Sequence, residues 1–211
     1  MGGEGDFWER NAGIYDTGID YVLGNNLRPI VLAMLGKEQP LGKTVEIGCG
    51  TGYFTPLLAQ LSDHVVATDI SEAMLNQAQE RVKGLPKVSV QREDAEKTSF
   101  PDMSFDTAFL GLIFQLVDGP KALAEMHRIL KPKGVLILAI PTMDGLRFVD
   151  KIRGVLRNYQ VYRTIKPLVQ GFIRAGRSLP SLRRQDSISS RSSRLLIPII
   201  LADFQAFIFR Q

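Results

Sequence analysis

The sequence is poor in the residues that build disulfide frameworks and metal centres. Its 211 residues include one cysteine, Cys49, and two histidines, His64 and His127. One thiol cannot staple a fold, and two distant histidines beside a single cysteine do not have the spacing of zinc ligands. The composition therefore predicts no bound metal and favours a reducing, cytoplasmic compartment.

Long apolar runs are also missing. The most apolar stretch, residues 195–209, is shorter than the roughly 20 residues that a bilayer crossing needs, and Pro198 and Asp203 interrupt it. The first six residues carry two acids and no apolar run, which argues against a secretory signal. We therefore expect a soluble chain or one that lies peripherally on a membrane.

Acidic residues become scarce towards the end of the chain. Residues 1–140 hold 13 Lys and Arg against 18 Asp and Glu, a net charge of −5, whereas residues 141–211 hold 13 against 4, a net charge of +9. Such a basic segment faces an anionic partner or simply water. Aromatic residues that could stack bases are sparse between the basic ones, which argues against nucleic acid as the partner.

Strand-like and helix-like sequence patterns alternate regularly between residues 44 and 140. Short runs of consecutive apolar residues are typical of parallel strands covered on both faces, and helical patterns fill the gaps. We predict strands at 44–47, 64–68, 88–92, 105–110 and 134–140, and helices at 54–62, 71–83 and 120–130, the second of them capped by Ser71. This order predicts one doubly wound α/β domain, for which the chain is long enough.

A glycine-rich bend follows the first predicted strand. Gly48, Gly50 and Gly52 alternate with Cys49 and Thr51 and lead directly into a helix. Glycine at such a bend lets a ligand lie against bare backbone. A nicotinamide-binding fingerprint would need glycine three residues after Gly50, where this chain has Tyr53, so the spacing weakens a pyrophosphate interpretation.

Five segments in order resemble the class I S-adenosylmethionine-dependent methyltransferases over roughly residues 40–141. The glycine bend with Glu46 inside the preceding strand is similar to the first motif of that family. The other similar segments are the second strand (65–71), a turn with Arg92-Glu93-Asp94-Ala95, the fourth strand (105–110), and a helix, turn and fifth strand (125–138). The subgroup that it resembles most includes small-molecule enzymes that methylate quinones and lipids.

The resemblance implies a Rossmann-like methyltransferase fold in one domain, residues 1–211. In that fold a mostly parallel seven-stranded sheet has an N-terminal helical lid, here residues 1–40, over a cofactor-binding core, residues 41–141. A basic helical substrate cap would follow the fifth strand at 142–176, with helices at 146–159 and 163–174. The last two strands would come from 177–211, at 178–184 and 203–210, and helical spacing of apolar residues at 7–35 fits the lid.

The resemblance also assigns cofactor contacts to the loop and to the first two strands. Gly48, Cys49, Gly50 and Gly52 would receive the methionine part, although a structural tight turn would also use these glycines. Glu46 would hold its ammonium group, and a buried carboxylate without such a partner would be costly. Asp69 would accept both ribose hydroxyls; the alternative is a helix N-cap, a role that Ser71 already fills.

The remaining contacts would surround the adenine and the cofactor's end groups. Ile70 and Met74 would flank the ring, although apolar residues there are equally ordinary core. Asp94 would accept a hydrogen bond from the adenine amino group, and the Ala95 N–H would donate one to the ring. The alternative is that Asp94 is only a loop carboxylate. The Leu110 carbonyl would face the ammonium, and Tyr15 would bond the cofactor carboxylate or simply pack in the lid.

No catalytic base is assigned, because the position at which the family often carries histidine holds Gln115. Methyl transfer from a sulfonium can rely on positioning, worth up to roughly 7–11 kcal/mol. We expect S-adenosylmethionine-dependent methylation of a small molecule, with a lipid or quinone precursor as one candidate acceptor. A non-catalytic cofactor-binding or scaffolding protein and an RNA or protein methyltransferase are the alternatives. The basic cap could recognise an anionic substrate, rest on anionic lipid, or be a solvated helix face.

Overall fold

The structure of this chain is a computed structural model that describes residues 8, 12–16, 27–38, 40–141, 197–201 and 204–210. The helices predicted at 146–159 and 163–174 and the strand predicted at 178–184 lie outside these residues, as does most of the predicted lid.

Five parallel strands lie side by side in the sheet, as the apolar runs predict. They are β1 (Lys43–Ile47), β2 (His64–Asp69), β3 (Val88–Arg92), β4 (Phe105–Gly111) and β5 (Leu130–Pro141). Only β5 differs clearly from prediction, because it begins four residues before Gly134. Leu130 already pairs with Phe105, and the register shifts between Phe105 and Thr107. Lys133 adopts a φ of 67° inside this strand, and the sequence around it reads as a turn.

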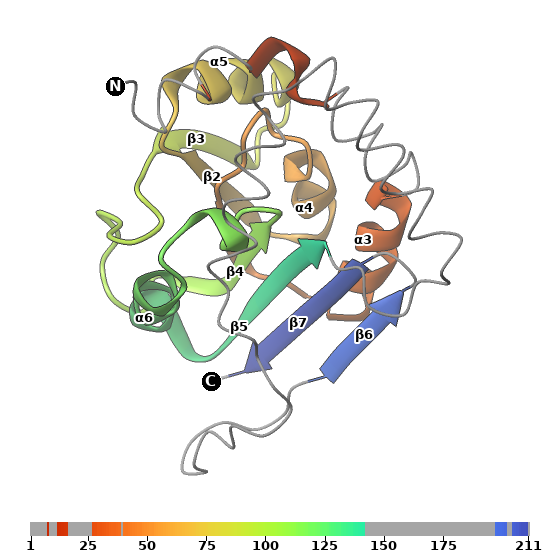
Figure 1. Cartoon of the computed structure of the whole chain (residues 1–211), viewed down its shortest axis with the longest axis vertical. Coiled ribbons are helices and arrows are strands. Elements are labelled where there is room, and N and C mark those ends of the chain that lie inside the picture. The colour runs from red at the N-terminus through yellow and green to blue at the C-terminus, as the bar shows by residue number, and fades with distance from the viewer. Residues whose placement is uncertain are drawn as a thin grey trace.

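The sheet order is β3-β2-β1-β4-β5-β7-β6. β7 (Phe204–Arg210) pairs antiparallel with β5, and β6 (Ile197–Leu201) pairs antiparallel with β7 (Figure 1). The position of β7 agrees with the strand predicted at 203–210. The described strand that pairs with β7 at the edge is Ile197–Leu201, a short, strongly apolar run close in sequence to β7 that was not among the predicted strands.

The predicted helices between the strands are present, each with bounds that differ slightly from prediction. They are α4 (Thr55–Leu61), α5 (Glu72–Arg81) and α6 (Gly119–Ile129). Ser71 caps α5 as expected, its hydroxyl accepting a hydrogen bond from the Met74 N–H at 3.3 Å. The remaining described helical segments are η1 (Ala12–Ile14), α3 (Leu27–Leu35), η2 (Gly36–Glu38) and η3 (Phe114–Leu116).

Helices cover both faces of the sheet (Figure 1). Alternate residues of β2 show this, because successive side chains of a strand point to opposite faces. Val65 belongs to a buried cluster with Val31 of α3 and Leu58 of α4, whereas Val66 packs in a cluster with Met126 of α6. α5 contributes Leu75 and Ala78 to a third cluster, which includes Cys49 and Ala67. The fold is thus the doubly wound, Rossmann-like α/β arrangement.

Within the described residues, no helix combines the length and the apolar character that a membrane crossing requires.

Candidate functional site

The candidate site lies where the chain reverses its direction of winding through the sheet. β1 has β2 on one side and β4 on the other, and all three strands run in the same direction. In open α/β sheets, ligands bind outside the carboxyl ends of strands at such a switch point. Gly48 follows β1 here, and Leu112 and Ile113 follow β4.

All three glycines of the bend have left-handed backbone conformations, with φ of 67° at Gly48, 54° at Gly50 and 76° at Gly52. A side chain at any of them would be strained. A Cβ on Gly48 would also lie 2.0 Å from Cδ1 of Ile113, and one on Gly52 would lie 3.2 Å from Cα of Ala78. Gly52 therefore has a structural role, since it lets α5 pack closely against the loop.

Asp69 joins the bend to the end of β2. Its carboxylate accepts hydrogen bonds from the Gly50 N–H at 2.8 Å and from the Ser71 N–H at 3.0 Å. The N-cap position of α5 belongs to Ser71 and not to Asp69. Asp69 is therefore placed at the carboxyl end of the strand, beside the glycine loop, as the sequence predicts.

Glu46 is a buried carboxyl group in the middle of the sheet, 1% exposed. The Thr55 hydroxyl donates a hydrogen bond to its Oε2 at 2.5 Å. Burial is the main cause that raises the pKa of Glu46 to about 8; the Thr55 hydrogen bond opposes this effect and the charge of Asp69 adds to it. A cation placed beside this group would favour its ionised form.

Tyr15 approaches the same loop from the N-terminal segment. Its Cε1 would be 3.5 Å from a Cβ on Gly50, so the ring lies next to the middle glycine. Burial, followed by the charges of Asp69 and Asp16, raises the pKa of the Tyr15 hydroxyl, which keeps it protonated. The ring also makes an edge contact with Trp8, with centroids 5.7 Å apart.

The loop also contains Cys49, whose side chain is buried and whose N–H donates to the Thr68 carbonyl at 2.7 Å. Burial raises the pKa of the Cys49 thiol, and the charges of Glu46 and Asp69 add to this effect. The side chain is thus a packed, protonated thiol.

The residues predicted around adenine differ in exposure. Ile70 is 49% exposed, whereas Met74 is 2% exposed and packs in the core. Asp94 is exposed and its Oδ1 accepts from the Glu96 N–H at 2.9 Å, while Ala95 is buried. The last predicted contact, Leu110, is fully buried in β4 between Ile47 of β1 and Leu138 of β5.

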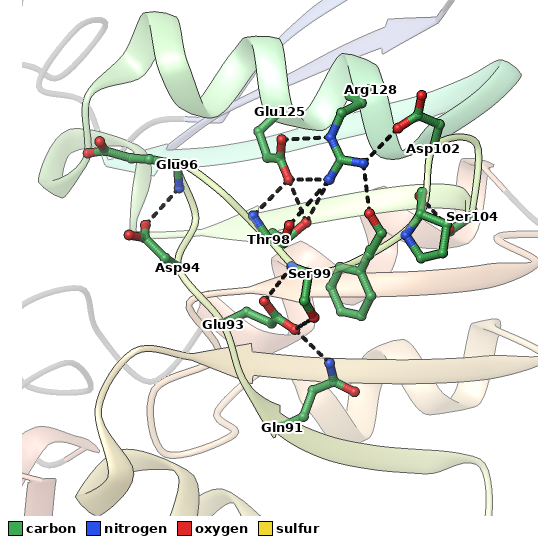
Figure 2. Close-up of polar contacts among 12 residues, drawn as sticks. Gln91, Glu93, Asp94, Glu96, Thr98, Ser99, Asp102, Ser104, Glu125 and Arg128 are labelled. Carbon is green, nitrogen blue, oxygen red and sulfur yellow. Dashed lines mark hydrogen bonds and ion pairs between the residues drawn. The ribbon is translucent and has the colours of Figure 1, made fainter.

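A polar network holds the turn that carries Asp94 and Ala95 against α6 (Figure 2). Glu125 accepts from both the Thr98 N–H at 2.7 Å and the Thr98 hydroxyl at 2.5 Å, and Arg128 pairs with Glu125 at 2.6 Å. Arg128 also reaches the Phe100 carbonyl and Asp102, each at 2.7 Å. The hydrogen bond from Arg128 is the main cause that lowers the pKa of Glu125 to about 2. Sequence reasoning missed this network.

Gln115 lies in η3, just after the end of β4. Its Nε2 donates to the Leu112 carbonyl at 2.5 Å, while its Oε1 is buried and has no hydrogen-bond partner. Leu112 itself has a φ of 65°, which is unusual for leucine. Strained backbone and an unpartnered buried polar atom are both common at functional sites. In the sequence, Gln115 is notable only because it stands where the resembled family often has histidine.

No group of three or more His, Cys, Asp or Glu among the described residues has the arrangement of a metal site.

Comparison with known proteins agrees with this geometry. Residues 45–138 match a sequence model described as a methyltransferase domain. The chain is 32% identical over 141 residues to malonyl-[acyl-carrier protein] O-methyltransferase of Serratia marcescens, a match that covers 66% of this chain and 53% of that protein. It is 31% identical over 147 residues to demethylmenaquinone methyltransferase of Symbiobacterium thermophilum, covering 66% and 57%. The chain thus spans about half the length of the curated relatives it matches.

The fold is also similar to solved structures. A SAM-dependent methyltransferase from Aquifex aeolicus superposes with a TM-score of 0.62 at 20% identity, over 96% of this chain and 97% of that chain. The residues that match the methyltransferase-domain model, 45–138, include the glycine bend, Asp69 and the strands on either side of the switch point. The solved structure shares the doubly wound α/β fold with this chain.

Proposed function

We propose that this protein transfers a methyl group from S-adenosylmethionine to a small-molecule acceptor. The observation that carries the proposal is the hydrogen bond between the Gly50 N–H and the Asp69 carboxylate, which brings the loop and a ribose-binding group together. A carboxylate has about four acceptor positions, which suit two backbone N–H groups and a diol.

The surrounding residues fit the other parts of this cofactor. Glu46 is a buried carboxyl with a raised pKa, which a neighbouring ammonium group would stabilise as the anion. Tyr15 beside Gly50 would bond the cofactor carboxylate, and Asp94 and Ala95 would meet adenine. Cys49, Gly48 and Gly52 would form the wall of the loop, Ile70 and Met74 would flank the adenine, and the Leu110 carbonyl would face the ammonium group. When bound, the cofactor supplies a sulfonium methyl group that is already activated for displacement.

Positioning is the main catalytic contribution that we assign to this chain. An amide such as Gln115 cannot remove a proton at neutral pH, but its unpartnered Oε1 can orient a hydroxyl or amine of the acceptor. Correct placement of the acceptor against the methyl group can supply up to roughly 7–11 kcal/mol. The acceptor proton would then leave to water or to a group of the acceptor itself.

We propose a lipid or quinone precursor as the acceptor. Relatives with this domain are named as methyltransferases for malonyl-[acyl-carrier protein] and for demethylmenaquinone. The net charge of +9 over residues 141–211 would suit an anionic acceptor or an anionic membrane surface. In this proposal residues 1–40 act as the lid, residues 142–176 as the cap, β6 and β7 complete a seven-stranded sheet, and the protein works in the cytoplasm or at its membrane.

A second candidate is a non-catalytic protein that binds the cofactor without transferring its methyl group. Gln115 favours this second candidate. It stands where the resembled family often has histidine, and its side-chain amide cannot accept a proton.

Two measurements test the proposal. Calorimetry with S-adenosylmethionine and S-adenosylhomocysteine should show binding of both, and absence of binding would end the proposal. A labelled-methyl screen over metabolite and membrane-lipid extracts should then show turnover that Gly50→Arg abolishes, because arginine at a φ of 54° would strain the loop and block it. Binding without any turnover would favour the non-catalytic candidate.

A further inference from the structure

Three polar side chains connect the N-terminal segment to the glycine loop and to α5. The Thr51 hydroxyl donates a hydrogen bond to the Asp16 carboxylate, and the Arg81 guanidinium forms an ion pair with the same carboxylate. Arg81 also donates from Nη1 to the Thr51 hydroxyl at 3.3 Å. Each member therefore contacts the other two, although 65 residues separate Asp16 from Arg81.

This triangle differs from an ordinary surface ion pair. Thr51 is fully buried and stands between two glycines of the loop, and Asp16 and Arg81 are only 28% and 29% exposed. Hydrogen bonds between charged groups that are partly removed from water are stronger than exposed ones. On the same helix, Glu80 and Lys83 form an exposed pair 3.6 Å apart, at 78% and 77% exposure.

Asp16 directly follows Tyr15 in the chain, and the Tyr15 ring lies next to Gly50. Fixing the Asp16 carboxylate on the loop and on α5 therefore also fixes where Tyr15 can lie. We propose that Asp16, Thr51 and Arg81 are positioning residues that hold Tyr15 over the cofactor site and thereby set the affinity for S-adenosylmethionine. This inference rests on the proposed function, because it assumes that the site takes that cofactor.

The chain carries its own reporter for this arrangement. Trp8 is the single tryptophan in the sequence, and its ring packs edge-on against Tyr15. Its fluorescence therefore depends on whether the N-terminal segment lies on the loop. We expect the emission of Trp8 to change on cofactor binding in the wild-type protein.

Asp16→Asn and Arg81→Met test the cluster, and Glu80→Gln is the matched control on the same helix. Asp16→Asn and Arg81→Met should each weaken S-adenosylhomocysteine binding about tenfold, because the loss of one charge-assisted hydrogen bond lowers an affinity by about this factor. Both should shift the Trp8 emission of the protein without ligand. Arg81→Lys should recover part of the affinity, and Glu80→Gln should bind and fluoresce as the wild type does.

A double-mutant cycle with Tyr15→Phe and Tyr15→Ala shows whether the cluster acts through Tyr15. In the Tyr15→Ala background, Arg81→Met should lose most of its effect on affinity, because the group that it positions is gone. The inference is overturned if Arg81→Met binds as tightly as the wild type, or if its full effect persists without Tyr15. Circular dichroism identifies any variant that has not folded. If Arg81→Met does not fold, the affinity of Arg81→Lys is measured in the same cycle instead. A wild-type protein that binds no cofactor would instead refute the proposed function.

Discussion

The Asp69 carboxylate accepts a hydrogen bond from the Gly50 N–H at 2.8 Å, and this contact joins the ends of β1 and β2 next to the switch point between β1 and β4. The same carboxylate holds the Ser71 N–H at the start of α5. One side chain therefore orders the loop and the next helix at the place where we propose that the ribose binds.

Gly52→Ala should destabilise the protein more than Gly84→Ala. Both glycines have positive φ, 76° and 85°, but a Cβ on Gly52 would lie 3.2 Å from Cα of Ala78, whereas one on Gly84 would meet nothing within 4 Å. Backbone strain costs about 1–2 kcal/mol at either position, and only Gly52→Ala adds a displacement of α5. Urea denaturation of the two variants measures the difference. Equal losses would show that α5 does not pack tightly on the loop.

Glu46→Gln should stabilise the protein increasingly as the pH rises from about 5 to 8. The folded-state pKa of Glu46 is about 8 and the ordinary value is 4.5, so between these values the folded protein keeps a proton that the unfolded chain releases. The free energy of unfolding therefore falls with rising pH, by at most about 1.4 kcal/mol per pH unit. Glutamine lacks this dependence and still accepts the Thr55 hydrogen bond. Denaturation at several pH values tests the prediction, which a pH-independent difference between the two proteins would contradict.

Binding of S-adenosylmethionine to the wild-type protein should release a proton near pH 7. An ammonium group beside Glu46 would lower the pKa of this carboxyl from about 8 and ionise it. Calorimetry in buffers of different ionisation enthalpy measures the number of protons released. Glu46→Gln should abolish the buffer dependence, and a release that persists in this variant would assign it to another group.

Much of the central sheet follows from local pattern, whereas the site's polar contacts do not. Consecutive apolar residues predict the buried parallel strands because both faces of such strands are covered. The early start of β5 depends on the pairing of Leu130 with Phe105, which no local pattern contains. The edge strand β6 is not predicted by the sequence, because its place depends on the antiparallel pairing of Ile197–Leu201 with β7, which a local apolar run does not specify.

Side-chain networks between distant segments were the least predictable feature. Tyr15, Asp69 and the three glycines could be named because they resemble family motifs. Thr51 and Arg81 meet Asp16 only after three elements have packed together, so their spacing in the sequence carries no signal. Glu125 and Arg128 are three residues apart on one helix, which indicates a pair but does not reveal that it binds Thr98.

Glu125→Gln should remove stability at neutral pH but little at pH 2. Arg128 and Thr98 hold the pKa of Glu125 at about 2, below its ordinary value of 4.5. The stabilisation is complete above the ordinary pKa and is lost as the pH falls through the folded-state value. We expect a cost of about 2 kcal/mol at pH 7 from charge-assisted hydrogen bonds. Asp118→Asn is the control and should cost less, because it removes the exposed ion pair with Lys121 while asparagine still caps the start of α6.

Isothermal titration of S-adenosylhomocysteine into the wild type, Asp69→Ala and Asp63→Ala tests the central claim most directly. Asp63 is an exposed carboxylate just before the opposite end of β2, so its variant controls for lost charge. We predict that Asp63→Ala binds as the wild type does and that Asp69→Ala binds at least about tenfold more weakly, since charge-assisted bonds contribute about 1.5–3 kcal/mol each. Unchanged affinity in a folded Asp69→Ala protein would contradict the account.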